Sequence, residues 1–195
     1  MKKLIAFIFI FCLMSSSVPA QELSYDYISQ NWKRLSQGQR EEIVDYLRDK
    51  LFERFVVETD FSRFAPRYKD NNYKENRRMF KNKQTTAEDR KVKPFYYKKI
   101  LVAYGIRYFD DKNHIYYYDA LGRLRYADVL DKPFDEFPSV AYQYNDFGEL
   151  IGVVYNVSED DYYVFKANSV FYGRWNKKKY YDINGKAIII RDMDD

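Results

Sequence analysis

The sequence predicts an α+β protein in which an N-terminal helical segment packs on a tyrosine-rich antiparallel β-meander of consecutive hairpins. Apolar residues recur at helical spacing between residues 36 and 55, whereas from residue 95 they alternate with polar ones at period two. Asp or Asn followed three residues later by Gly separates several of these runs, as in hairpin turns. We divide the chain into a leader (1–20), a helical segment (21–62), a basic connecting segment (63–94) and a sheet region (95–195).

Residues 1–20 have the features of a signal peptide. Lys2 and Lys3 precede an apolar run from Leu4 to Met14 that is too short to span a bilayer, and Val18 to Ala20 offers a cleavage site. We expect cleavage before Gln21 and an exported protein, located in the periplasm or outside the cell. An uncleaved membrane anchor is the alternative.

Cleavage would leave a mature chain without cysteine. The single cysteine, Cys12, lies in the apolar run of the leader. An exported protein without disulfides depends on its hydrophobic core, and a chain of this length is large enough to build one as a single domain.

The helical segment is predicted from its cap and its apolar stripe. Ser36 is a suitable N-cap and Gln39 completes a capping box. We expect helix between Gln21 and Phe61, with a shorter helix from Leu23 to Leu35 before the main one. The apolar stripe, which we expect to face the core, consists of Ile43, Val44, Leu47, Leu51 and Phe55.

The connecting segment is strongly basic. Residues 63–99 carry 13 basic and 4 acidic side chains, a net charge of +9. We expect an exposed, partly disordered connection with some helix between Tyr73 and Lys83. It either binds transiently to an anionic surface or is a solvated connection neutralised by its acidic flanks. No motif supports specific nucleic-acid binding. The residues proposed for surface binding, called here the basic patch, are Arg77, Arg78, Lys81 and Lys83.

From residue 95 onward the pattern predicts seven to nine short strands. Turn residues separate the runs, which favours an antiparallel meander over a parallel sheet. Asp119 and Gly122, Asn145 and Gly148, and Asp182 and Gly185 are the expected structural residues of three hairpin turns. The expected strands include residues 100–109, 115–118, 123–129, 140–144, 149–155, 162–166, 170–175, 179–182 and 187–191.

The three turn units resemble the Tyr-Asp (YD) repeats of Rhs and wall-associated secreted proteins. The first unit comprises Tyr116, Tyr118-Asp119 and Gly122-Arg123-Leu124. The second retains Tyr142, Tyr144, Gly148 and Leu150, and the third Tyr181-Asp182 and Gly185. The resemblance implies a secreted or surface β-structure used for binding or as a scaffold, and it implies no enzyme chemistry.

Tyrosine is concentrated in the predicted sheet, where 16 of the 21 tyrosines lie between Tyr96 and Tyr181. Helices on one face of the sheet leave the other uncovered. Tyrosine also forms strands well and stacks across them, so a structural role is the alternative to ligand binding. The residues that we single out as a possible ligand platform are Tyr116, Tyr117, Tyr118, Tyr162 and Tyr163.

No catalytic motif is present in the sequence. His114, the sole histidine, lies in a predicted polar turn. The clusters at residues 110–113 and 159–161 lack the spacing of a calcium loop, and we expect no metal and no cofactor. The two carboxylates of a glycoside hydrolase come together in the fold and have no fixed spacing in the sequence, so the sequence leaves such an active site open.

The leading functional prediction is a non-catalytic binding or scaffold module that contacts glycan, wall polymer or a protein partner. The alternatives are a carboxylate-dependent enzyme acting on a wall or glycan polymer, and a secreted inhibitor or antitoxin-like protein.

Overall fold

The computed structural model of the protein describes residues 32–52 and 61–190. The predicted leader, the predicted helix before residue 32 and the end of the helical segment at residues 53–60 lie outside these residues. The elements are η1 (Trp32–Arg34), α2 (Gln37–Phe52), η2 (Phe61–Arg67), α3 (Tyr73–Lys81), β1 (Arg90–Tyr97), β2 (Ile100–Tyr108), β3 (His114–Asp119), β4 (Leu124–Leu130), β5 (Ser139–Asn145), β6 (Leu150–Ser158), β7 (Asp161–Lys166), β8 (Phe171–Asn176), β9 (Lys179–Tyr181) and β10 (Ala187–Ile190).

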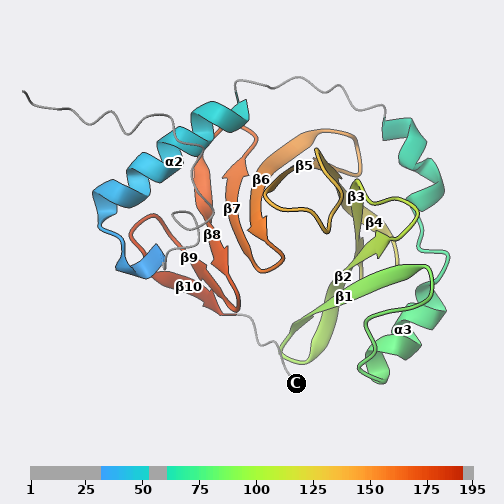
Figure 1. The fold of residues 1–195 in the computed structure, drawn as a ribbon. Coiled ribbons are helices and arrows are strands. Elements are labelled where there is room, and N and C mark those ends of the chain that lie inside the picture. Colours follow the sequence, from blue (N-terminus) through green and yellow to red (C-terminus); the bar gives the residue numbers. More distant parts are fainter. Residues whose placement is uncertain (1–31, 53–60, 191–195) are drawn as a thin grey trace, which may run out of the picture.

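All ten strands form one antiparallel sheet, and their order in the sheet is their order in the chain. The α+β class and the meander are therefore confirmed. The sheet bends into an open trough, with α2 and α3 on its convex outside (Figure 1). The strand missing from the predicted set is β1, which begins inside the segment expected to be a connection.

The helix α2 covers the C-terminal half of the sheet. The backbone N–H of Ser36 donates to Oε1 of Gln39 at 2.9 Å, and the N–H of Gln39 donates to Oγ of Ser36 at 3.3 Å, so the predicted capping box forms. The described part of the apolar stripe is buried as predicted. This α2 core consists of Trp32, Leu35, Ile43, Val44, Leu47, Leu51, Val153, Tyr155, Val157, Tyr163, Phe165 and Tyr181.

The basic connecting segment is folded, so the prediction of an exposed and partly disordered connection is wrong for residues 63–94, whereas the helix expected between Tyr73 and Lys83 is present as α3. Its scattered apolar residues Phe64, Met79 and Phe80 are buried against the sheet, while most of its basic residues point to solvent. The two short helices η2 and α3 give too few turns for a long amphipathic pattern to be visible. The sheet side of this α3 core consists of Val92, Tyr104, Ile106, Tyr108, Tyr116, Tyr118, Leu124, Ala127 and Tyr144.

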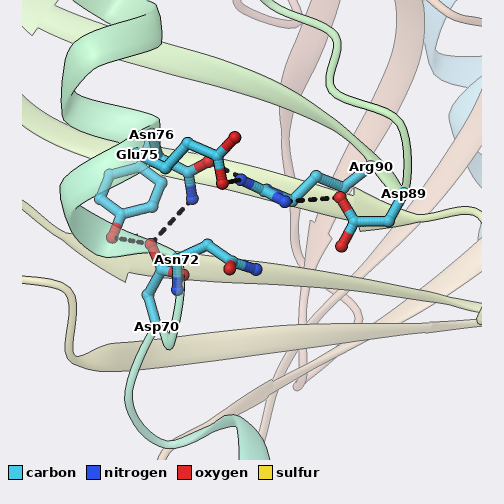
Figure 2. A network of polar contacts seen from close by, with 7 residues as sticks. Asp70, Asn72, Glu75, Asn76, Asp89 and Arg90 are labelled. Atoms are coloured by element: carbon cyan, nitrogen blue, oxygen red, sulfur yellow. Dashed lines mark hydrogen bonds and ion pairs between the residues drawn. The ribbon is translucent and has the colours of Figure 1, made fainter.

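A chain of polar contacts fixes α3 against β1 and β2 (Figure 2). The buried carboxylate of Asp70 accepts hydrogen bonds from Oη of Tyr104 at 2.7 Å and from Nδ2 of Asn76 at 2.9 Å. Arg90 donates from Nε to Oδ1 of Asn76 at 3.0 Å and from Nη2 to Oε2 of Glu75 at 2.8 Å. Asp70, Asn76, Arg90 and Tyr104 are buried and satisfy one another, with the exposed Glu75 as a further partner of Arg90, so the network fixes how α3 is oriented on the sheet.

The three predicted turn units form matching hairpin turns. Each glycine is left-handed, with φ of +78° at Gly122, +82° at Gly148 and +76° at Gly185. In each turn the side-chain oxygen of the opening residue accepts the backbone N–H four residues later, at 2.8 to 3.0 Å. These opening residues are Asp119, Asn145 and Asp182. The predicted turn chemistry is therefore confirmed.

The helical segments hold two of these turn tips. Arg40 of α2 donates to the carbonyls of Ile183 at 2.6 Å and Asn184 at 2.9 Å in the third turn. Tyr73 of α3 donates to the carbonyl of Ala120 at 3.0 Å in the first turn. The helical segments are therefore fixed to the sheet by apolar cores and by hydrogen bonds to the β3–β4 turn and the β9–β10 turn.

A concave hollow as the candidate functional site

A hollow of about 460 Å³ lies on the face of the sheet that the helices leave uncovered. This volume is within the range of small-molecule sites in proteins. The hollow is lined by both charged and apolar residues: Lys91, Val92, Lys93, Phe95, Val102, Ala103, Gly105, Arg107, Ile115, Tyr117, Tyr126, Asp128, Leu130, Phe134, Phe137, Gln143, Val154, Asn156, Ser158, Glu159, Tyr162, Val164 and Trp175.

A buried carboxylate, Asp128, lies at the centre of the lining strands. Only 4% of the residue is exposed. Its Oδ2 accepts a hydrogen bond from Oη of Tyr117, and its Oδ1 accepts one from Nε2 of Gln143, both at 2.9 Å. Burial raises the pKa of Asp128 to about 6, against the opposing effects of these two hydrogen bonds and of the Arg107 charge.

Strand alternation explains why these groups face the hollow. In β4, Ala127 is fully buried in the α3 core, so its neighbour Asp128 points to the other face. Tyr117 in β3 pairs with Gly105 in β2, and a side chain at Gly105 would lie 3.2 Å from the Tyr117 ring. Glycine at this position therefore lets the ring lie against β2. Burial raises the pKa of Tyr117, so its phenol stays protonated and donates to Asp128.

Two aromatic pairs line the same hollow as Asp128. Tyr117 and Tyr126 on β3 and β4 have ring centroids 4.7 Å apart. Tyr162 and Trp175 on β7 and β8 have centroids 6.3 Å apart. Such rings offer flat apolar faces together with hydroxyl or N–H groups at their edges.

Ion pairs link the turn between β6 and β7 to β1 and β2 across the hollow. Glu159 lies 2.9 Å from Nζ of Lys91 and 3.6 Å from Nη1 of Arg107, and Asp160 lies 3.8 Å from Nζ of Lys93. The hydrogen bond from Lys91 lowers the pKa of Glu159. These contacts join segments that are far apart in the strand order, as expected of a curved sheet.

The structure separates the five tyrosines that the sequence proposed as a platform. Tyr116, Tyr118 and Tyr163 are buried in the two cores, with at most 3% of each residue exposed, so an exposed platform of all five is wrong. Tyr117 and Tyr162 lie in the hollow. Adjacent residues of a strand face opposite sides, which divides the two Tyr-Tyr runs in this way.

The basic patch lies outside the hollow, on and just after α3. Arg78, Lys81 and Lys83 are exposed, while Arg77 is half-buried with its guanidinium 6.0 Å from the Tyr73 ring. The patch and the hollow are therefore different surfaces.

His114 also lies away from the hollow. Its Nδ1 is 2.5 Å from Oδ1 of Asp111, whose Oδ2 accepts a hydrogen bond from Tyr116 at 2.7 Å. Burial opposes ionisation of Asp111, but these hydrogen bonds lower its pKa. The ring packs edge-on against Phe64 with centroids 5.2 Å apart, so His114 borders the α3 core rather than lying in a purely solvated turn.

Sequence reasoning missed Asp128, Gln143, Arg107 and Trp175 as site residues. A single signal was available for Asp128, namely a charged residue between Ala127 and Val129 in a predicted strand. A polar side chain inside an apolar strand marks the face that does not enter the core. The curvature that brings Glu159 near Arg107 had no counterpart in the local pattern.

Comparison of the chain with protein-family models, curated proteins and solved structures found no match. No helix within residues 32–52 and 61–190 has the length and apolarity to cross a membrane. In the same residues, no three His, Cys, Asp or Glu side chains are grouped so as to hold a metal ion. The fold is a curved antiparallel sheet with a hollow of about 460 Å³ on its concave face.

Proposed function

We propose that the protein is an exported binding module that holds a small molecule, or one unit of a polymer, in the concave hollow. The observation that carries this proposal is the convergence of a buried carboxylate and two aromatic pairs on one hollow of about 460 Å³. Binding sites combine apolar walls with a few placed polar groups in this way.

Tryptophan fluorescence tests binding because the two tryptophans report on different faces. Trp175 lines the hollow, whereas Trp32 is buried in the α2 core with 1% exposed. Ligands of neutral, cationic and anionic character should be titrated into the purified protein. A ligand in the hollow should change the emission of the wild type but not that of Trp175→Phe. Saturable binding with the same emission change in both proteins would contradict this site.

A carboxylate-dependent enzyme is the second candidate. Asp128 and Glu159 line the same hollow, and their pKa values are shifted in opposite directions. Pairs of this kind divide the roles of acid and base in glycoside hydrolysis. Both carboxylates already have hydrogen-bond or ion-pair partners within the protein, and this favours the binding function over catalysis. Release of reducing ends from a wall or glycan polymer, absent in Asp128→Asn, would favour the enzyme.

Export is proposed from residues 1–20, and the mass of the protein in extracytoplasmic fractions tests it. We expect a chain beginning at Gln21 without Cys12. A membrane-bound species with an intact leader would support the anchor instead.

We further propose that the basic patch attaches the protein transiently to anionic surfaces. Three of its four side chains are exposed on a segment with a net charge of +9. Attraction of this kind is screened over about 8 Å at physiological ionic strength, so it should weaken steeply as salt is added.

A further inference from the structure

We infer that the ligand of the hollow is a neutral sugar residue, selected by hydrogen bonds from its hydroxyl groups to Asp128 and Gln143. This inference rests on the proposed binding function and specifies its ligand class. It follows from three properties of the hollow: its remaining hydrogen-bonding capacity, its charge balance and its aromatic walls.

Asp128 and Gln143, the polar pair of the hollow, have hydrogen-bonding capacity left for a ligand. An ionised carboxylate accepts at about four positions. Two of these on Asp128 are occupied, one by Tyr117 and one by Gln143. The Gln143 amide donates one N–H to Asp128, and its chemistry includes a second N–H and a carbonyl oxygen. Adjacent acceptor and donor groups suit hydroxyls on neighbouring carbon atoms, because each hydroxyl both donates and accepts.

The charge balance favours a neutral ligand. Three cations around the hollow meet three carboxylates: Lys91 and Arg107 share Glu159, and Lys93 faces Asp160. The third carboxylate is Asp128, on which the charge of Arg107 also acts. A cationic ligand at Asp128 would meet the charge of Arg107, which already acts on that carboxylate. An anionic ligand at the same place would meet Asp128 itself. Neither ligand finds an unbalanced charge of opposite sign, whereas a neutral polyol needs none.

The aromatic walls suit a ring with apolar faces and polar edges. The Tyr117–Tyr126 pair lies on β3 and β4, and β4 also carries Asp128. The Tyr162–Trp175 pair lies on β7 and β8, beyond the strand β5 that carries Gln143. A pyranose ring presents C–H groups on its faces and hydroxyls at its rim. Aromatic faces therefore contact the ring while the polar floor takes the hydroxyls.

The test uses the Trp175 emission with three probe classes at one ionic strength. The neutral probes are N-acetylglucosamine, glucose and cellobiose, the cationic probe is choline and the anionic probe is decanoate. We expect saturable binding of at least one neutral sugar and an unchanged affinity when salt is raised from about 0.05 to 0.5 M, because no net charge is paired. Binding of choline or decanoate but of no sugar would overturn the ligand class while leaving the binding function intact. No response to any probe class would contradict both.

Two further measurements assign the role of Asp128. Asp128→Asn should weaken sugar binding at least tenfold, since hydrogen bonds to an ionised group are the stronger ones. Asp135→Asn, a change at an exposed carboxylate outside the lining, is the matched control and should bind like the wild type. An Asp128→Asn protein that folds and binds normally would overturn the assignment.

The pH profile of the wild type tests Asp128 even when the variant does not fold. The groups facing this carboxylate are Arg107, Tyr117 and Gln143; burial raises the pKa of the Tyr117 phenol well above its usual value, and Gln143 carries no ionisable group. With the Asp128 pKa near 6, sugar affinity should fall about tenfold from pH 7.5 to pH 5. A flat profile would show that the ligand does not depend on the carboxylate and would contradict the inference.

Discussion

Replacing Tyr104 or Tyr118 by Phe compares two stacked rings that differ in the fate of their hydroxyls. The ring centroids are 5.5 Å apart, and both residues are fully buried in the α3 core. The Tyr104 hydroxyl donates to Asp70 at 2.7 Å, whereas the Tyr118 hydroxyl has no hydrogen-bond partner among the described residues. Both substitutions retain the ring and remove one oxygen, so cavity effects are matched.

The expected outcomes are opposite. Tyr104→Phe should lower the free energy of unfolding by about 1.5 to 3 kcal/mol, because a buried carboxylate loses a charge-assisted hydrogen bond. At about 2 to 4 °C per kcal/mol for a domain of this size, the melting temperature should fall by roughly 3 to 12 °C. Tyr118→Phe should be neutral or slightly stabilising, because it removes a buried hydroxyl that no described group satisfies.

Urea unfolding of the two variants and the wild type is the measurement. We expect equal m-values, with a lower midpoint for Tyr104→Phe alone. A loss for Tyr118→Phe as large as that for Tyr104→Phe would refute the reasoning, since it would show that the network around Asp70 does not distinguish the two hydroxyls.

Three further predictions address the turn, the hollow and the basic patch. Gly185→Ala should destabilise the protein by about 2 kcal/mol or more in thermal melts, because φ is +76° and a Cβ would lie 2.9 Å from Nη1 of Arg40. The control is Gly38→Ala in α2, which has open space around it and should be neutral or stabilising. Asp128 has a folded pKa of about 6, above its unfolded value near 3.8, so its contribution to stability is present below pH 4 and is lost as pH rises through 6. The unfolding free energy of wild type relative to Asp128→Asn should therefore fall by about 2 kcal/mol between pH 4 and 7, and a constant difference would contradict the raised pKa. Replacing all four basic-patch residues by Gln should reduce binding to anionic vesicles at low salt without changing the melting temperature, and salt-insensitive or unchanged binding would show a solvated surface only.

The sequence predicts the meander because its signals are local. Turn chemistry at Asp119 and Gly122 depends on four or five residues, and period two is visible within one strand. The capping box at Ser36 is equally local. These elements form as predicted, although most strands begin or end one to three residues away from the predicted positions.

The candidate site depends on contacts between residues that are far apart in the sequence, and local sequence patterns do not reveal such contacts. Arg107 and Glu159 are far apart in the sequence and meet only because the sheet curls. The strand β1 contains Lys91, Lys93 and Pro94, which obscure the alternation of a strand. At the edge of a sheet these residues are common, because lysine and proline discourage pairing with another chain. The composition of β1 therefore suggested a connecting segment, although its position at the sheet edge makes it a strand.

The tyrosines of the sheet have different surroundings on its two faces. On the convex face, rings such as Tyr104 and Tyr163 have less than 1% of their surface exposed beneath the helical segments and serve as core. On the concave face, Tyr117 and Tyr162 border the hollow beside the buried Asp128. A buried carboxylate on the uncovered face, whose charged form is disfavoured by its surroundings, is costly for the fold, and the proposed ligand would offset part of that cost by hydrogen bonding to it.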